Sequence, residues 1–505
     1  MTSHVLAPAE AAPHPDAMPR GPLALALTFR RAVAVLAVAT FALYAAWSLH
    51  LFANGTAGWD LAIFDQAVRH YSQFSAPTIP IRGPGYVALG DHFSPVLVLA
   101  VPLYWIWADP RMLLLLQAAL VAASVPVVAR FARRHATPGV ALALSAAYAL
   151  GWPLQQLASF DFHEVAFAVP LLALALDGLD RRSDRTLLLA CVGLLLVRED
   201  MGLVVACLGL IRACRVRTGW RSRSVGVGLS VVGVLAYEVV TSVVIPHFSV
   251  TGTWGYWGYG AIAPDVPGVL AVVVEHPLRV AAMFVDSQVK VYTLVALFIG
   301  CVAVLRSPFL LVAAPLLASR FLSARESLWV VPYHYNSVLW PVLFVGALDG
   351  ARRLPAALRR RVLVATAVVG LVLPAAGLLV VGPYPVFNPH PENRTFLPPA
   401  TADARAVRSL VPASVCVQAE QHQAVHLVSR DLVTLPVDIS DRPDFVLLDR
   451  WAPAGAQGPT GSKGPSGRAY ERIARAAGYE QVARHGRVVL LRSPGYTGPS
   501  ARCRP

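Results

Sequence analysis

The sequence predicts an α-helical polytopic membrane protein of about eleven transmembrane helices that ends in a small extracytoplasmic α/β domain. Of its 505 residues, 56% are hydrophobic and only 14% are charged, whereas about a quarter of the residues of a soluble domain are charged. Arginines concentrate in short loops between long apolar runs, as in "RFARRH", "DRRSDR" and "ARRLPAALRRR", and this pattern is typical of cytoplasmic loops. It accounts for the net charge of +14 without a nucleic-acid-binding face. We therefore expect a multi-pass protein of the plasma (inner) membrane with no nucleic-acid partner.

The N-terminal part of the chain predicts a tail, one span and a long external loop. Residues 1–30 read as a disordered cytoplasmic tail, and the apolar run 31–53 is long enough to be a first span. Residues 54–110 then form the external loop. Within it, the apolar run 94–108 is shorter than the roughly 17–25 residues of a span and contains prolines and tryptophans, which favour an interfacial or re-entrant segment.

The remaining apolar runs alternate across the membrane and complete a transmembrane domain of residues 31–382. The predicted spans are 111–129, 138–158, 164–180, 186–198, 200–213, 224–245, 288–305, 308–322, 332–349 and 362–382, with an external loop over 246–286. An odd number of spans with the N-terminus inside places residues 383–505 outside the cell.

This C-terminal region has a different composition and predicts a small domain. Four segments, "SVCVQA", "DLVTLP", "DFVLLD" and "GRVVLLR", read as short strands, and "GRAYERIARAAG" reads as a helix. Strands that alternate with helices indicate an α/β fold. Cys416 and Cys503 are the two cysteines that could pair in an extracytoplasmic compartment.

Ionisable residues gather on the predicted external side. They are Asp60 and Asp65, Asp91 and His92, Asp161, His163 and Glu164, and Arg198, Glu199 and Asp200. A charged group at the middle of a bilayer costs about 2.5–3.5 kcal/mol, so the last six of these groups left in lipid would cost roughly 15–20 kcal/mol. This exceeds the net stability of about 5–15 kcal/mol of a typical fold. These groups therefore either form an internal salt-bridge cluster or line a watery cavity open to the outside.

Geometry separates the two acids of "GWDLAIFDQAVRHY". On a helix they lie about 140° apart and face different ways. Asp65 precedes Arg69 by one helical turn and predicts an ordinary ion pair. Asp60 stands where the first span emerges, with no such partner, which favours either a helix N-cap or a catalytic carboxylate.

Five segments taken in order carry a resemblance to a known family. "WDLAIFDQA", "GDHFSPVLVLAVPLYW", "FDFHE", "LVREDM" and "PYHYN" resemble a bacterial family of multi-pass membrane proteins, domain of unknown function 2079, over about residues 55–450. That family in turn resembles the GT-C glycosyltransferases, which use polyprenyl-phosphate sugars. The resemblance implies a GT-C-like fold, a polyprenyl-phosphate-linked sugar donor and a glycan, lipid or protein acceptor in the cell envelope. It also places Asp60 on the catalytic acid of the first external loop, with Leu61 where those relatives commonly have a second acid.

Such a reaction needs a carboxylate base for the acceptor hydroxyl and cations for the leaving phosphate. We assign the base to Asp60. For the phosphate we consider Arg198, Arg320 and Arg325, the last also fitting an anchor for lipid headgroups. The remaining substrate-binding candidates are Asp65, Asp91, His92, Asp161, His163, Glu164, Glu199, Asp200, His334 and Tyr335. The aromatic segment 253–260 suits either sugar stacking or an interfacial belt.

A divalent metal ion is a second open question. Asp91, His92, Asp161 and His163 could hold one if their two loops meet, although such residues in loops are more often only hydrogen-bonded.

Two other classes of function stay open. A transporter or lipid-linked-sugar flippase would also bury charges near the membrane, but it favours internal repeats, which the sequence does not show. A non-catalytic receptor or scaffold would explain the C-terminal domain, but not the charged hairpin "VREDM".

Overall fold

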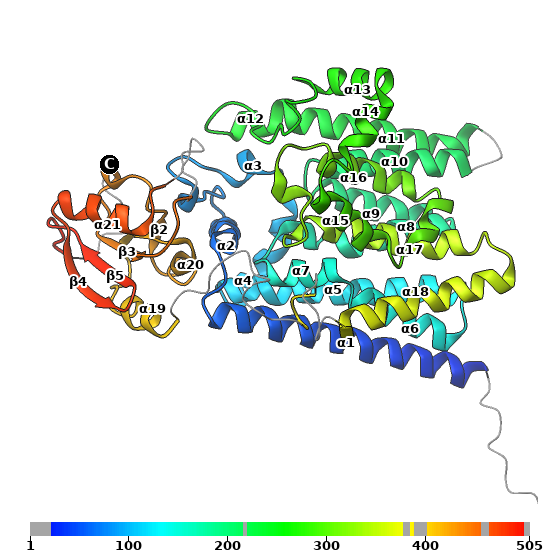
Figure 1. Ribbon diagram of the computed structural model, residues 1–505, viewed down its shortest axis with the longest axis horizontal. Coiled ribbons are helices and arrows are strands. Elements are labelled where there is room, and N and C mark those ends of the chain that lie inside the picture. The colour runs from blue at the N-terminus through cyan, green and yellow to red at the C-terminus, as the bar shows by residue number, and fades with distance from the viewer. Residues whose placement is uncertain (1–21, 216–219, 377–383, 388–400, 456–463, 499–505) are drawn as a thin grey trace, which may run out of the picture.

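The computed structural model describes residues 22–215, 220–376, 384–387, 401–455 and 464–498. Most of the tail 1–30, the end of the span 362–382 and Cys503 lie outside these residues. A bundle of helices forms the larger part of the molecule, and a small sheet domain lies beyond one end of the bundle, next to α2 and α3 (Figure 1).

The N-terminal half of the bundle follows the predicted spans closely. Its helices are α1 (Pro22–Ala53), α5 (Pro110–Arg133), α6 (Pro138–Ala149), α7 (Trp152–Ser159), α8 (Ala168–Arg181), α9 (Asp184–Leu195), α10 (Met201–Arg215) and α11 (Trp220–Val239). The predicted span 138–158 is broken between α6 and α7 at Gly151, where a Cβ atom would collide with the ring of Trp340. The close approach of that ring explains why the chain needs glycine at the break.

The C-terminal half of the bundle is less regular. It contains a π-helical turn (Val240–Val244), α12 (Ile245–Phe248), α13 (Val266–Glu275), α14 (Pro277–Met283), α15 (Gln288–Phe298), α16 (Leu310–Phe321), α17 (Leu339–Ala351) and α18 (Ala356–Ala376), with 3₁₀ turns at Val302–Arg306, Glu326–Leu328 and His334–Val338. Another 3₁₀ turn, Glu164–Ala166, precedes α8 in the N-terminal half. The sequence predicts only a loop over 246–286, but α13 and α14 form two apolar helices bent by 107° at their junction. Each is too short to register as a span, which is why the hydropathy pattern missed them.

Only some of these helices can cross a membrane by themselves. In the described part of the chain, three helices are long and apolar enough, and α13 with α14 makes a fourth if the bent pair is one span. Many predicted spans instead consist of shorter apolar helices, such as α15 and α16. The count of eleven spans therefore stays a prediction.

The first loop after α1 is folded rather than extended. It contains α2 (Trp59–Ser72), a 3₁₀ turn (Pro80–Arg82), α3 (Ala88–Asp91), a second 3₁₀ turn (Pro95–Ala100) and α4 (Val101–Ile106). The apolar run is helical over Pro95–Ile106, too short to cross a bilayer. Leu99, Trp105 and Ile106 are exposed on it. These exposed apolar side chains fit the predicted interfacial segment.

The C-terminal region is a five-stranded sheet in the order β2-β1-β3-β5-β4. Its strands are β1 (Cys416–Ala419), β2 (Leu432–Thr434), β3 (Phe445–Asp449), β4 (Glu480–His485) and β5 (Val488–Arg492), and its helices are α19 (Thr401–Arg408), α20 (Gln421–Ala424) and α21 (Gly467–Ala476), with a 3₁₀ turn at Ile439–Asp441. The strands β2, β1 and β3 are parallel, and β5 is antiparallel to both β3 and β4. The predicted small α/β fold is confirmed, and Cys416 is disulfide-bonded.

Contacts join this domain to the bundle near the start of the first loop. The rings of Phe52 and His426 lie 4.5 Å apart. The side chain of Gln66 in α2 donates to the carbonyl of Val433 in β2 at 3.5 Å and accepts from the backbone N–H of Ile81 at 3.0 Å. Helix α2 is therefore fixed between the bundle and the sheet.

Candidate functional site

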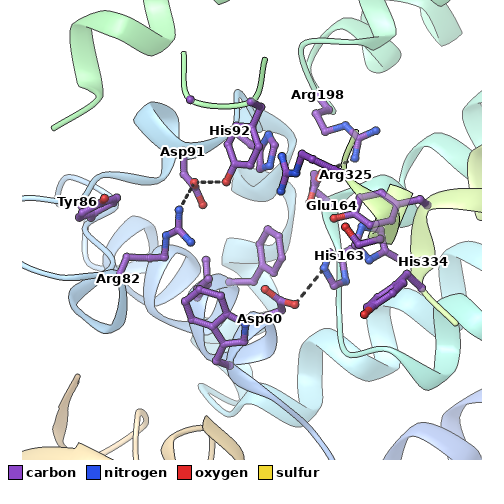
Figure 2. A pocket seen from close by; sticks show the side chains of 18 of the residues that line it. Asp60, Arg82, Tyr86, Asp91, His92, His163, Glu164, Arg198, Arg325 and His334 are labelled. Carbon is purple, nitrogen blue, oxygen red and sulfur yellow. Dashed lines mark hydrogen bonds and ion pairs between the residues drawn. The ribbon is translucent and has the colours of Figure 1, made fainter. Parts of the chain in front are cut away.

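A cavity of about 830 Å³ opens where α2, the end of the bundle and the C-terminal domain meet. Its walls come from the first turn of α2, the segment around α3, the turn before α8, the α9–α10 turn, the loop after α12 and the segment before α17. The C-terminal domain adds Gln421, Leu435 and Gly455. Segments far apart in the sequence thus contribute side chains to one space (Figure 2).

The structure brings most of the predicted site residues to this cavity. Those that line it are Asp60, Asp91, His92, His163, Glu164, Arg198, His334 and Tyr335. The lining does not include Asp65, Asp161, Glu199, Asp200 and Arg320. These five residues contact the lining residues or the helices that carry them, as described below.

Asp60 lies in the first turn of α2 and faces the cavity (Figure 2). Its side chain is 24% exposed, and its Oδ2 lies 3.7 Å from Nε2 of His163. Burial, together with the negative charge of Asp161, raises the pKa of Asp60 to about 7. Asp91 and Glu164 act in the same direction as Asp161, and Arg82 acts against them. A carboxylate of this kind exchanges a proton near neutral pH.

Asp60 is not the cap of its helix. The N-cap residue of α2 is Gly58, which has no side chain to accept a hydrogen bond. The carboxylate of Asp161 takes that role from a distant segment, because both of its oxygens accept from the N–H of Gly58 at 2.9 Å. Oδ2 of Asp161 also accepts from the N–H of Leu61 at 3.5 Å. Asp60 is thus left with its carboxylate turned toward the cavity.

His163 lies against Asp60 in a stack of rings. Its imidazole is stacked on that of His334 with centroids 3.5 Å apart, and Phe64 contacts its other side edge-on at 5.5 Å. Burial lowers the pKa of His163 to about 3. The contact with Asp60 is therefore one between a carboxylate and a neutral imidazole, which can donate one hydrogen bond without a net charge.

A second group of side chains forms the opposite wall. Arg82 binds Asp91 at 2.8 Å and lies over the rings of Trp59 and Tyr86. The hydroxyl of Tyr256 donates to the same Asp91 oxygen at 2.6 Å.

His92 joins this wall to the α9–α10 turn. Its ring stacks on Tyr256 at 4.1 Å, and its Nδ1 lies 2.8 Å from Glu199. Burial opposes the charged form, but the charge and hydrogen bond of Glu199 outweigh it and raise the pKa of His92 to about 9. His92 is therefore a cation at neutral pH, paired with Glu199.

The predicted phosphate-binding arginines have different surroundings. Arg198 is buried and binds Asp200 through two nitrogens at 2.8 and 2.6 Å, with Glu164 at 3.7 Å. Arg320 is buried away from the cavity, where it donates to the carbonyls of Leu316 and Tyr335 at 2.7 and 3.0 Å. Both guanidinium groups are thus largely committed to partners within the protein.

Arg325 is the arginine with fewer commitments. It is exposed at the cavity wall, and its guanidinium carbon lies 4.9 Å from the centroid of the Tyr256 ring. Among the described residues, the structure records no ion pair and no hydrogen bond from its side chain. Figure 2 shows Arg325 beside His92 and Glu164. It is a cation available to a bound anion.

The pair predicted for Asp65 is confirmed. Its carboxylate is fully buried and lies 3.0 Å from Arg69, and it also accepts from the hydroxyl of Tyr104 at 2.7 Å. Asp65 therefore joins α2 to α4 rather than facing the cavity.

The four metal candidates do not form a metal-binding group. Within the described ranges, no set of three or more His, Cys, Asp or Glu side chains is arranged to hold an ion. Asp91 is held by Arg82 and Tyr256, and Asp161 is held by the backbone of α2.

Sequence reasoning missed Arg82, Trp59 and Tyr86 of the cavity lining. A signal for Arg82 was present: it is an arginine in a predicted external loop, against the usual preference for cytoplasmic loops. The residues of the C-terminal domain gave no signal, because only the tertiary contacts with α2 bring them to the cavity.

Known proteins similar to this chain include one solved structure and one protein family. The crystal structure of ArnT from Cupriavidus metallidurans bound to undecaprenyl phosphate is similar at a TM-score of 0.49, with 14% sequence identity over 95% of this chain and 100% of that one. No curated protein matches the chain. The model of the family described as predicted membrane protein (DUF2079) matches residues 50–490. The chain therefore belongs to the DUF2079 family of membrane proteins.

Proposed function

We propose that this protein is an integral membrane glycosyltransferase. It transfers a sugar from a polyprenyl-phosphate donor to a hydroxyl of an envelope acceptor, in the cavity beside Asp60. The observation that carries the proposal is Asp60 itself: a half-buried carboxylate on a cavity wall, with a pKa of about 7 and a neutral imidazole as its neighbour.

Asp60 acts as the general base. The acceptor oxygen forms a bond to the anomeric carbon of the sugar while the bond from that carbon to the phosphate oxygen breaks. The acceptor proton passes to Asp60, and the polyprenyl phosphate leaves with the bonding electron pair. A base with a pKa near the working pH is the most effective for this transfer, and the neutral ring of His163, 3.7 Å away, lies against the carboxylate.

Arg325 binds the leaving phosphate. A phosphate that gains negative charge in the transition state is stabilised by a cation that has no other anionic partner. Arg198 is neutralised by Asp200, so it contributes less net charge to the cavity. The rings of Trp59, Tyr86 and Tyr256 offer apolar faces on which a sugar ring can stack.

The proposed site faces the extracytoplasmic side. In this arrangement residues 31–382 form the transmembrane domain, residues 54–110 its first external loop, and residues 383–505 the extracytoplasmic domain. The disulfide at Cys416 supports this orientation, because disulfides persist in oxidising compartments and are rare in the cytosol.

The test uses the full-length protein in liposomes with ¹⁴C-glucosyl and ¹⁴C-mannosyl undecaprenyl phosphate as donors and an envelope fraction as acceptor. We expect wild type to release undecaprenyl phosphate and to label the acceptor. Asp60→Asn should lower this rate about 10²–10⁴-fold, as loss of a general base does. The matched control is Asp265→Asn, which alters an aspartate at the N-terminus of α13.

Two results would count against the proposal. Equal release of undecaprenyl phosphate by Asp60→Asn and wild type would remove Asp60 from the chemistry. Movement of intact labelled donor across the vesicle membrane by both proteins, without release of the phosphate, would favour a flippase.

A further inference from the structure

We propose that Asp161 is a positioning residue, which holds the N-terminus of α2 from the turn before α8 and thereby fixes where the carboxylate of Asp60 stands. This inference rests on the proposed function and assigns Asp161 a role outside substrate or metal binding.

The geometry of the contact is that of a helix cap supplied by another segment. A helix begins with backbone N–H groups that have no partner within the helix, and a capping oxygen that accepts from one of them stabilises the helix. Gly58 offers no such oxygen, and a Cβ atom on it would stand 3.0 Å from Oδ2 of Asp161. The absence of a side chain at Gly58 therefore makes room for the carboxylate of Asp161, only two residues before Asp60.

The turn that carries Asp161 is itself held in an unusual conformation. Asp161 has a φ of 51°, in the left-handed region, which is strained for most residues and is best tolerated by Gly, Asn and Asp. Gln117 of α5 holds this turn in place, because its Nε2 donates to the carbonyls of Leu157 at 2.9 Å and Asp161 at 2.6 Å.

The same Gln117 also fixes the neighbour of Asp60. Its Oε1 accepts from the backbone N–H of His163 at 3.1 Å. One side chain of α5 thus sets the position of the Asp161 carboxylate, which caps α2, and of the His163 ring, which contacts Asp60. Asp60 and its partner are aligned by a shared support, as catalysis requires when a misplacement of about 1 Å can cost about 100-fold.

The experiment compares Asp161→Gly and Asp161→Asn in the full-length protein. Glycine keeps the left-handed backbone and removes the carboxylate, whereas asparagine keeps an acceptor oxygen and tolerates the same φ. We expect Asp161→Gly to lower kcat at least about tenfold with the donor KM changed less than about twofold, and Asp161→Asn to restore most of kcat. The control Asp265→Ala removes the cap of α13, an ordinary cap in which Oδ1 accepts from Gly268 at 2.8 Å, and should leave kcat unchanged.

Hydrogen exchange of the peptide covering residues 56–66 provides a readout that does not need activity. Faster exchange in the first turn of α2 for Asp161→Gly, and near-wild-type exchange for Asp161→Asn, are expected. Unchanged exchange in Asp161→Gly overturns the inference whether or not the protein turns over. Faster exchange with kcat within twofold of wild type also overturns it, because the cap would then stabilise α2 without positioning Asp60. A wild type inactive with both labelled donors refutes the proposed function alone and leaves the exchange result to decide the inference.

Discussion

Lowering the pH from 8 to 5 should abolish sugar transfer with a midpoint near pH 7, because Asp60 accepts a proton only when it is ionised. Burial and the charge of Asp161 raise its pKa to about 7, so about half of the molecules carry the base at pH 7 and about 1% at pH 5. We therefore expect kcat to fall about 50-fold between these two values, with a slope of one on a logarithmic plot.

The neighbouring imidazoles do not obscure this titration. The pKa of His163 is about 3 and that of His92 about 9, so neither group changes charge between pH 5 and 8. Asp161, by contrast, changes charge in this pH range, because burial raises its pKa to about 6. The pH profile of Asp161→Asn measures the contribution of Asp161, because loss of that negative charge should move the midpoint for Asp60 to lower pH.

The sign of a second shift provides an independent check. Arg82 lowers the pKa of Asp60, so Arg82→Gln should move the midpoint to higher pH, opposite to the shift in Asp161→Asn. The assay is the release of undecaprenyl phosphate at saturating donor in buffers of constant ionic strength. A midpoint near 4, or shifts of the same sign in both variants, would show that the group that titrates is not Asp60 in this environment.

Three further changes test other parts of the structure. Arg325→Ala should weaken the binding of undecaprenyl phosphate about 10–100-fold, the equivalent of one charge-assisted hydrogen bond of about 1.5–3 kcal/mol, as measured by calorimetry with Arg325→Lys as the milder control. Gly350→Ala should lower the thermal stability in detergent by about 1–3 kcal/mol, because the new Cβ would collide with the carbonyl oxygen of Ala303, whereas Gly139→Ala, with no atom within 4 Å of its Cβ, should not. Tyr104→Phe removes the hydroxyl that donates to buried Asp65 and should cost about 1.5–3 kcal/mol; an unchanged melting temperature would contradict the role of that bond.

Local patterns predicted much of the fold. The four buried strands of the C-terminal domain were all predicted, because each is a short run of apolar β-formers. The fifth, β4 (Glu480–His485), was not, because it is a largely exposed edge strand of polar residues and its pairing with β5 is a tertiary effect. In the same way, α13 and α14 are each too short to be recognised as a span, and only the two together are long and apolar enough.

The sequence predicted which residues lie at the site better than it predicted their hydrogen-bond and ion-pair partners. The expected external position of the polar segments placed eight of the candidate residues at one site, and all eight line the pocket. The sequence could not assign partners, because these depend on which loops meet. Asp161, a candidate for substrate or metal binding, accepts hydrogen bonds from the backbone at the start of α2. Arg198 was expected to bind phosphate and is held by Asp200.

The distribution of pairs separates structural charges from those kept for a ligand. A cluster that served only to fix helix packing would neutralise each buried charge, because breaking a buried pair costs about 3–5 kcal/mol. Three couples around the cavity obey that rule: Arg82 with Asp91, Arg198 with Asp200, and His92 with Glu199. Asp60 does not, because the partner that the described residues offer it is a neutral imidazole, and burial together with the negative charge of Asp161 raises its pKa to about 7. A half-buried carboxylate with a raised pKa lowers the stability of the fold at high pH, and proton exchange by Asp60 in the proposed reaction would account for this cost.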